Sequence, residues 1–328
     1  MGGNDPGTRL SLTSDELPVL FEAADNAALR GQRRTLHCNR ARLLGAVVAA
    51  LGGGLTLTVD GKDLWAFVAL IGFVVALVAE LTLFVQQPER DWYHGRAVAE
   101  SVKTLAWKYA VGGSPFPPTL PEADAKRLLR DRVRAVVIKG SDRIVVSEHG
   151  PLITESMAAL RQGSREERLA VYLRDRISDQ QHWYASAAGR NRVRAQFWRL
   201  VLVLGEVAAI IAAAGRAFSG WEGDWSGILA AVVASAAAWL GIKRHDELAA
   251  AYSVAATELA IAADRLADAT EEDWPGIVAD AEEAISREHT LWLASRSDPG
   301  TTLTVDDVRK AVPAPAEEVR KPTPAAES

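Results

Sequence analysis

The sequence predicts an all-α membrane protein in which two transmembrane helical hairpins, four transmembrane helices in all, continue into long cytosolic helices that form a helical bundle. Two observations predict this fold. Strongly apolar runs occur in two adjacent pairs within a chain that is otherwise rich in charge. The same basic tetrapeptide precedes each pair, as Asn39-Arg40-Ala41-Arg42 and, 152 residues later, as Asn191-Arg192-Val193-Arg194. The repeat indicates a duplicated membrane unit.

The apolar runs are long enough to cross a hydrocarbon layer of roughly 30 Å, because an α-helix rises about 1.5 Å per residue. A mean hydropathy of zero and 24% charged residues hide these runs, since polar helices offset them in the average. A buried hairpin in a soluble protein is the alternative, but soluble core helices rarely carry such unbroken apolar runs in adjacent pairs. The expected spans cover residues 43–59, 64–85, 200–218 and 225–242.

The remaining chain reads as helix almost throughout. Thr13 with Glu16, and Ser164 with Glu167, have the spacing of capping boxes at helix starts. The second helix is expected to continue without a break into the third membrane span, which makes it about fifty residues, or roughly 75 Å, long. Further helices are expected at residues 245–268 and 277–295, with Trp274-Pro275-Gly276 interrupting them.

These elements divide the chain into two membrane units. Four prolines in residues 114–121 mark a linker, and a short strand is expected at 143–146. The tail is rich in Pro, Ala and Glu, which favours disorder. The expected organisation is a disordered N-terminus over 1–14, a first unit over 15–112, a linker with a short helix over 113–153, a second unit over 154–296, and a mostly disordered tail over 297–328.

Basic residues predict the orientation of both hairpins. No secretory signal peptide is visible in the polar first residues, so the first apolar segment is expected to target the chain to the membrane. Lys and Arg concentrate on cytoplasmic flanks of membrane proteins, where they also meet lipid headgroups. Both interhelical turns should therefore face away from the cytoplasm and both termini should lie inside. The flanking residues that carry this assignment are Arg40, Arg42, Arg192, Arg194, Arg199, Lys243 and Arg244.

Two carboxylates interrupt the apolar spans. Glu80 and Glu206 are each expected roughly 10 Å inside the cytoplasmic boundary. A carboxylate at that depth costs about 2 to 3 kcal/mol, and such residues usually face a protein interior or a water-filled path. They are candidate pore residues, while a structural pair or protonated groups between helices is an equally weighted alternative.

Small residues in the spans permit close helix packing, either within one chain or between copies. Four helices are too few to enclose a wide channel, because a four-helix bundle fills its own centre with side chains. A pore would therefore require a homo-oligomer within the lipid bilayer. The candidate packing positions are Gly52, Gly53, Gly54, Ala230, Ala234 and Ala238.

Enzymatic readings find little support in the sequence. The six histidines are scattered and Cys38 is the one cysteine, so neither a zinc cluster nor a disulfide is expected, and no cofactor is expected. No Gly-rich phosphate loop follows a strand. The arginines between residues 127 and 134 alternate with acidic residues, as on an exposed helix, so nucleic acid is not an expected partner.

Two sets of motifs resemble the SLATT superfamily, the two-transmembrane effector domains named for associating with SMODS nucleotidyltransferases and SLOG nucleotide sensors. The first set resembles one branch of the superfamily and comprises the run Ala24 to Arg34 together with Trp92, Tyr93, Arg96, Glu100, Lys103 and Trp107. The second set resembles a different branch and comprises residues 153–161 together with Arg176, Gln180, Trp183, Tyr184, Glu288, His289 and Trp292.

The resemblance covers residues 15–296 and implies a membrane effector, not an enzyme, of a bacterial conflict or anti-phage system. It implies the bacterial inner membrane, perturbation of that membrane, and a separate nucleotide-sensing or nucleotidyltransferase partner that supplies the trigger. The alternative function is a non-conducting membrane scaffold or adaptor whose cytosolic helices recruit partners. Tryptophans on those helices, such as Trp107 and Trp183, either make such contacts or form the core where the long helices pack together.

Overall fold

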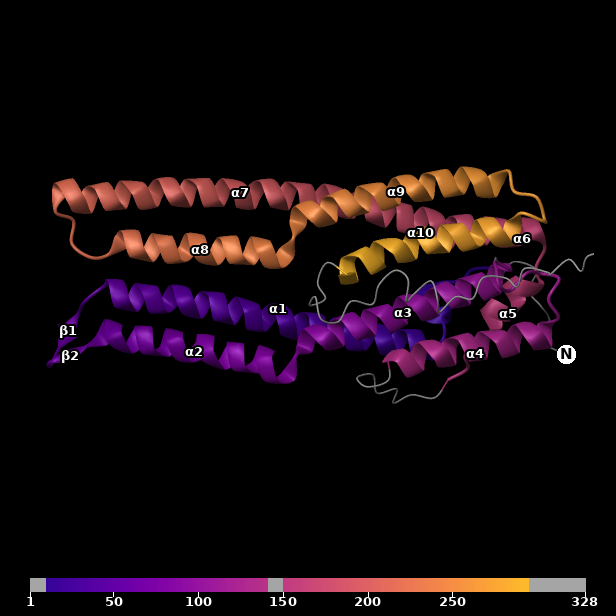
Figure 1. Cartoon of the computed structure of the whole chain (residues 1–328), viewed down its shortest axis with the longest axis horizontal. Helices are drawn as coiled ribbons and strands as arrows, with labels where there is room; N and C mark the ends of the chain where they lie inside the picture. Colours follow the sequence, from indigo (N-terminus) through magenta and orange to yellow (C-terminus); the bar gives the residue numbers. More distant parts are fainter. Residues whose placement is uncertain (1–9, 141–149, 295–328) are drawn as a thin grey trace, which may run out of the picture.

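A computed structural model describes residues 10–140 and 150–294 of the chain, with backbone alone for 139–140 and 287–294 (Figure 1). The strand expected at 143–146 and the tail 297–328 lie outside these residues. The described chain is almost entirely helical. Its long helices run nearly parallel to one axis, so the molecule is an elongated rod with apolar hairpins at one end and charged helices at the other (Figure 1).

The first unit is a long helix followed by a return path in two pieces. The chain runs out along one helix, turns through a two-stranded hairpin, and returns along two helices separated by Gln87, whose φ of 45° is left-handed. Pro88 can begin the last helix because its missing N–H is not needed there. The elements are α1 (Val19–Gly54), β1 (Thr58–Val59), β2 (Lys62–Asp63), α2 (Leu64–Gln86) and α3 (Pro88–Val111).

The second unit repeats this path. A helix of 55 residues from Arg165 to Ser219 runs outward, and two helices return with left-handed Arg244 (φ 50°) between them. The expectation of one unbroken helix is confirmed, although a single π-helical turn lies within it. Its elements are α6 (Arg165–Tyr172), the π-turn η2 (Leu173–Ser178), α7 (Asp179–Ser219), α8 (Trp225–Lys243) and α9 (His245–Ala267).

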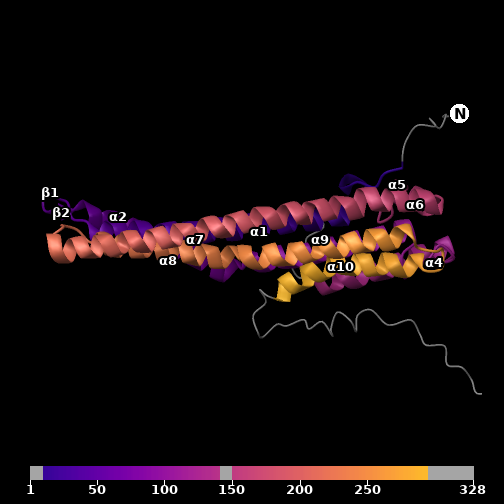
Figure 2. The ribbon, with the colours of Figure 1, turned by 90° about the horizontal axis from the view of Figure 1, so that it is seen from above.

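Four further elements complete the charged end of the rod, opposite the hairpin tips (Figures 1 and 2). The last of them begins at Trp274, so Trp274-Pro275-Gly276 forms its first turn and does not interrupt a helix as expected. Proline is tolerated there because the first N–H groups of a helix have no partner within the helix. The elements are η1 (Ser14–Glu16), α4 (Glu122–Gly140), α5 (Glu155–Gln162) and α10 (Trp274–Ala294).

Among the described residues, three helices are long and apolar enough to cross a membrane, and they contain α2, α7 and α8. The first expected span, 43–59, does not form one helix. The α1 helix ends at Gly54, and the chain beyond it is extended into the strand Thr58–Val59. Three successive glycines at 52–54 explain the early end, because glycine loses the most backbone entropy in a helix. Only the apolar half of α1 thus lies beside α2.

Both predicted capping boxes form. Ser164 N–H donates to Glu167 at 2.7 Å and Glu167 N–H donates back to the Ser164 hydroxyl at 3.2 Å. Thr13 and Glu16 form the other box at η1. Part of the segment expected to be disordered is instead packed, since Leu12 is 2% exposed and its N–H donates to Asp175.

A continuous apolar core holds the charged end together. It joins aromatic side chains from α3, α6 and α10, including Trp107, Tyr172 and Trp274, each 1% exposed or less. The Trp107 and Tyr172 rings lie 5.8 Å apart, and the Tyr172 and Trp274 rings lie 6.3 Å apart. Residues of both units therefore share one core. The hairpin end is different, because most of its large apolar side chains are exposed, as expected for surfaces that face lipid.

Candidate functional site: the membrane-spanning layer

The four helices of the hairpin end lie in an open row. The α2 helix packs on α1, α1 packs on α8, and α8 packs on α7. Figure 1 shows this order from bottom to top. Within the described residues α2 and α7 have no comparable contact, so the row does not close into a four-helix bundle. A single chain consequently has no enclosed centre at membrane depth.

Close packing of small residues builds the first hairpin. A Cβ on Gly52 would lie 2.3 Å from the backbone nitrogen of Ala69, and one on Gly72 would lie 2.5 Å from that of Ala49. The α1 and α2 backbones therefore touch directly. Gly54 instead faces α8, where a Cβ would meet Ile228 at 2.9 Å, while Gly53 faces open space.

The alanine stripe on α8 has no such role inside the chain. Ala230, Ala234 and Ala238 are all exposed on the surface of the row. Packing within one chain therefore accounts for Gly52 and Gly54 but not for the three alanines. In the membrane this stripe faces lipid or another protein surface.

Glu80 is held by a chain of polar contacts that begins in α1. Arg42 donates from Nη1 to Glu80 at 2.7 Å and from Nη2 to the Asn39 side-chain oxygen at 3.1 Å. Asn39 is 8% exposed and donates to the Thr35 carbonyl at 2.9 Å. The carboxylate itself is half exposed, with 54% of its side chain accessible. Glu80 thus has a partner within its own hairpin but remains open to its surroundings.

Glu206 has an exposed side chain on α7 and no hydrogen-bond or ion-pair partner among the residues that the structure describes. Its height can be compared with that of Glu80. Ser235 on α8 donates to the Leu43 carbonyl of α1, and a Cβ on Gly205 would touch Val233, two residues from Ser235. Because α2 and α7 run in opposite directions, Glu80 lies to the rod side of this level and Glu206 to the tip side, roughly 10 Å apart along the row. Both carboxylates are therefore within the apolar part of the row, on opposite outer helices.

The duplicated asparagine has the same local role in both units. Asn191 donates to the Ala187 carbonyl at 2.9 Å, as Asn39 does to Thr35, which lies 152 residues earlier. The side-chain oxygens differ in partner, because Asn191 contacts Nδ1 of buried His245 at 2.6 Å. In the first unit Pro88 follows the left-handed residue and offers no such group. Asn39 is thus bonded within α1, whereas Asn191 also joins α7 to α9 through His245.

Aromatic and acidic side chains of the chain itself hold several of the basic flanking residues. The Arg40 guanidinium and the Lys243 ammonium lie over the Trp239 ring, 5.2 Å and 5.1 Å from its centre. Arg199 pairs with Asp246 at 2.6 Å and Arg244 with Glu247 at 2.8 Å. Arg192 and Arg194 are exposed. Together they form a basic belt where the row meets the charged end of the rod.

The family-like motifs of the first unit cluster on α3 and its neighbours. Arg96 pairs with Asp25 at 3.1 Å and with Glu100 at 2.7 Å, which raises the pKa of this guanidinium despite its burial. Burial and nearby Arg176 lower the pKa of Lys103, whose ammonium lies 5.5 Å from the Phe21 ring centre. Trp92 and Tyr93 have rings 5.4 Å apart.

One motif residue of the second unit forms a buried ion pair. Arg176 and Glu282 are 1% and 0% exposed and are joined by two hydrogen bonds of 2.9 and 2.7 Å. The Tyr172 and Thr104 hydroxyls also donate to Glu282. Glu282 holds the Arg176 pKa above its usual range even though burial opposes the charge. Sequence reasoning missed Glu282, because nothing local marks a residue whose partner lies 106 positions away.

The other motif residues of this unit are placed less centrally. The Trp183 ring meets the Tyr184 and Tyr252 rings edge-to-face, with ring centres 5.2 and 5.3 Å away, yet Trp183 remains 44% exposed. Gln180 is half-buried nearby. Glu288, His289 and Trp292 lie in α10, where the structure describes the backbone alone.

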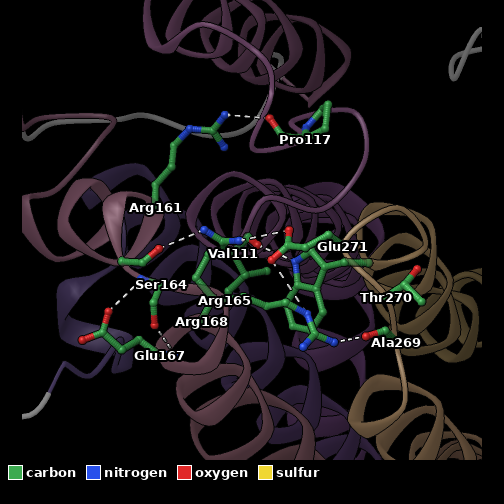
Figure 3. Close-up of polar contacts among 12 residues, drawn as sticks. Val111, Pro117, Arg161, Ser164, Arg165, Glu167, Arg168, Ala269, Thr270 and Glu271 are labelled. Atoms are coloured by element: carbon green, nitrogen blue, oxygen red, sulfur yellow. Dashed lines mark hydrogen bonds and ion pairs between the residues drawn. The ribbon is translucent and has the colours of Figure 1, made fainter.

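Arg161, the last residue of the 153–161 motif, lies at the end of the rod far from the hairpins, and Figure 3 shows its contact with the Pro117 carbonyl. Arg161 donates to four carbonyls, among them those of Tyr109, Phe116 and Pro117 at 2.9 to 3.1 Å, and so holds the proline-rich linker. Trp274 donates from its indole to Val111 at 2.7 Å. The Trp274 bond thus joins α10 to the end of α3, and the Arg161 bonds join α5 to the linker.

Nothing among residues 10–140 and 150–294 gathers three or more His, Cys, Asp or Glu side chains in a way that could hold a metal ion. The two best-formed hollows are shallow. One of about 300 Å³ lies at the bend between α8 and α9, and one of about 280 Å³ lies beside the linker. The distinctive polar groups of the molecule are instead those of the membrane-spanning row.

Two family comparisons decide the identity. Residues 18–169 match SMODS and SLOG-associating 2TM effector domain 3, and residues 172–292 match SMODS and SLOG-associating 2TM effector domain 1. The chain is a tandem SLATT protein with two different branches. The first match runs to residue 169, so it extends past the expected end of the first unit at residue 112, through α4 and α5. No curated protein and no solved structure matches the chain.

Membership makes the chain a membrane effector protein, because both matched domains are two-transmembrane effector domains. The structure adds how two such domains combine. Each contributes one hairpin to a shared row and helices to a shared core. The tandem SLATT chain is therefore a single unit, and its hairpins cannot move independently without disturbing that core.

Proposed function

We propose that this tandem SLATT protein oligomerises in the bacterial inner membrane and makes it permeable to ions as the effector of a conflict system. The observation that carries the proposal is the pair of carboxylates, Glu80 and Glu206, within the apolar part of an open row of helices. Charged groups at membrane depth usually line a water-filled path or a protein interior. A single chain offers no such interior, so a path requires several copies.

The orientation of the basic belt supports a cytoplasmic position for the charged rod and both termini. A signal from a separate nucleotide-sensing or nucleotidyltransferase partner would then reach the rod from inside the cell. The shared core supports transmission to the hairpins, because α1 and α7 each run unbroken from that core into the membrane. A displacement of α1 or α7 in the charged rod, caused by partner binding, would shift the same helix within the row.

Ion flux from liposomes tests this function. Purified full-length protein should release a trapped ion, and the double substitution Glu80→Gln with Glu206→Gln should reduce the flux by tenfold or more by removing charge from the path. Glu222→Gln is the matched control, because Glu222 is an exposed carboxylate in the α7–α8 loop outside the helices. Membrane depolarisation in expressing cells provides the same comparison with cellular partners present.

Three outcomes separate the functions. Loss of flux in the double variant alone supports a path lined by the carboxylates. Flux that the double variant leaves unchanged would give Glu80 and Glu206 a structural role. Absence of both flux and depolarisation would favour the scaffold function, for which Trp183, exposed on the cytosolic part of α7, is the aromatic group available to a partner, whereas Trp107 is buried in the core.

A further inference from the structure

The open row has two uncovered edges in the membrane. One is formed by α2, whose side chains Leu70 and Leu77 are each 58% exposed, and the other by α7, with Val203 56% and Ile210 68% exposed. The inner helices α1 and α8 each have two neighbours, whereas α2 and α7 each have one. Both edges lie along the whole apolar length of the row.

The two units follow one another in the row by translation. From α7 across the row to α2, the outward helix α7 is followed by the returning helix α8, and the outward helix α1 is then followed by the returning helix α2 (Figure 1). The returning helices α2 and α8 are equivalent, since each ends at a left-handed residue, Gln87 or Arg244. The outward helices α1 and α7 are equivalent, since each carries the buried asparagine, Asn39 or Asn191.

The contact between α8 and α1 thus joins the returning helix of one unit to the outward helix of the next. We propose that copies of this chain associate by the same contact, with α2 of one copy packed on α7 of the next. A third unit placed on either edge keeps the alternation of helix directions. The partner is therefore a second copy of the chain, and its surface is already present, in related form, inside each molecule.

Glu206 gives a second reason for an occupant at the α7 edge. It is exposed in an apolar stretch and has no partner among the described residues. A carboxylate facing acyl chains is unfavourable, so protein or water must meet it in the membrane. A lipid-covered α7 would leave this cost in place, whereas a neighbouring copy brings its Arg42–Glu80 pair to the same interface.

The outward helices α1 and α7 differ at one position of the repeat. Glu206 occupies the position that Gly54 has in α1, 152 residues earlier, where a Cβ would already meet Ile228 at 2.9 Å. A glutamate cannot approach its neighbour that closely. The contact between copies must therefore be wider at this level than the contact inside the chain, which leaves room for water beside the carboxylates.

Head-to-tail contacts of this kind generate rings when the rotation per copy closes, unlike isologous dimers, which use one surface twice. A ring would place the Glu80 side chains of all copies at one level of the apolar layer and the Glu206 side chains at a second level nearer the hairpin tips. The inference rests on the proposed function only in requiring several copies, because the contact could exist in a non-conducting assembly. It names the interface that a pore of this protein would use.

Disulfide cross-linking tests the interface in native membranes. Leu77 and Val203 lie at matching heights. Gly45 on α1 packs beside Ala76, the neighbour of Leu77 on α2, and Leu43 on α1 lies beside Ser235 on α8. Ser235 is two residues from Val233, which faces Gly205 on α7. Two differently tagged full-length chains, both with Cys38→Ser, would carry Leu77→Cys or Val203→Cys and be co-expressed. Mild oxidation should join the two tags in a cross-linked dimer, at least tenfold above either variant expressed alone.

Phe218→Cys is the matched control for Val203→Cys, because Phe218 is 90% exposed on the same helix but 15 residues, or about 22 Å, further along. Its cross-linking to Leu77→Cys should be absent. Cross-linking of either single variant with itself would indicate an isologous contact and overturn the proposal, as would equal yields for Val203→Cys and Phe218→Cys or no product at all. The liposome flux is measured separately, so cross-linking without flux refutes the pore alone, and flux without cross-linking refutes this interface alone.

Discussion

At the scale of single residues, the Arg176–Glu282 pair is the most demanding feature of the structure. Both side chains are essentially inaccessible, and desolvation of two charges costs several kcal/mol unless the pair and its hydrogen bonds remain intact. Tyr172 and Thr104 supply those further bonds to the carboxylate. The pair therefore ties α10 to η2 and α3 only while every member is present.

Arg176→Met should lower the free energy of unfolding by about 3 to 5 kcal/mol, because it leaves Glu282 buried and unpaired. Adding Glu282→Leu should restore part of that loss by removing the stranded charge. Thermal unfolding in detergent measures both. Arg265→Met is the control, since its partner Asp280 also lies on α10 but the pair is about half exposed and should change stability by less than about 1 kcal/mol. Equal losses in the two single variants would contradict this account.

Lys103 should make stability depend on pH in a defined direction. Burial and the positive charge of Arg176 lower the pKa of its ammonium in the folded protein, so the folded state holds this proton less tightly than the unfolded state. The charge is therefore a cost at neutral pH that disappears as pH rises through the folded pKa toward the ordinary value of a lysine. Lys103→Met should melt at a higher temperature than the natural protein at pH 7, and this advantage should shrink toward pH 10.

A melting difference that stays constant or grows with pH would show that the ammonium is not strained by its surroundings. Lys62→Met is a suitable control, because Lys62 is exposed in the β1–β2 hairpin and should show no pH-dependent difference.

At the scale of elements, the α1–α2 hairpin depends on backbone approach at particular glycines. Gly52 and Gly53 are neighbours in one helix, yet a side chain on Gly52 meets the backbone of α2 and one on Gly53 meets nothing within 4 Å. Their difference isolates packing from helix propensity, because both positions have the same intrinsic preference for alanine over glycine.

Gly52→Ala should destabilise the protein by about 1 to 3 kcal/mol, as overpacking does in tight interfaces. Gly53→Ala should be neutral or stabilising by up to about 1 kcal/mol through reduced backbone entropy. Unfolding by a denaturing detergent, followed by helical circular dichroism, gives both values. If the two variants shift together, the helices do not approach as described.

Element boundaries also show where local sequence rules are sufficient. The Ser164–Glu167 capping box is a property of four adjacent residues, and it formed as predicted. The end of α1 was harder to predict, because three glycines inside an apolar run are compatible with either a continuing span or a helix terminus. Packing of Gly54 on α8, with Asp224 donating from its N–H to the Gly54 carbonyl at 3.0 Å, stabilises the terminus.

At the scale of the whole molecule, the orientation of the rod across the membrane is a testable consequence of the basic belt. Cys38 is the one cysteine and lies on the rod side of that belt, near Arg40. A membrane-impermeant thiol reagent should leave it unmodified in intact spheroplasts and modify it in inverted vesicles. The partial burial of Cys38 calls for a second site, so Arg34→Cys, exposed on the same side, should behave alike.

Lys62→Cys in a Cys38→Ser background provides the opposite control, because Lys62 is exposed in the turn between α1 and α2. It should react in spheroplasts. Modification of Arg34→Cys there, together with protection of Lys62→Cys, would reverse the orientation of both hairpins.

The sequence by itself determined the membrane character, the helical class, the duplication and both SLATT branches. Each depends on signals that are local or periodic: apolar runs of sufficient length, capping spacings and short motifs. Glu80 and Glu206 could be singled out for the same reason, since a carboxylate in an apolar run is conspicuous without any knowledge of its neighbours.

Only the tertiary structure decided how the hairpins combine. The open order α2–α1–α8–α7, the partner of Glu80 in Arg42, the lack of a described partner for Glu206, and the burial of Arg176 against Glu282 all depend on contacts between residues distant in the chain. Apolar helices in lipid have no strong preference for one neighbour over another, because lipid tails are as apolar as their side chains. Small residues and a few polar contacts select the neighbours, and their complementarity exists only once the helices lie side by side.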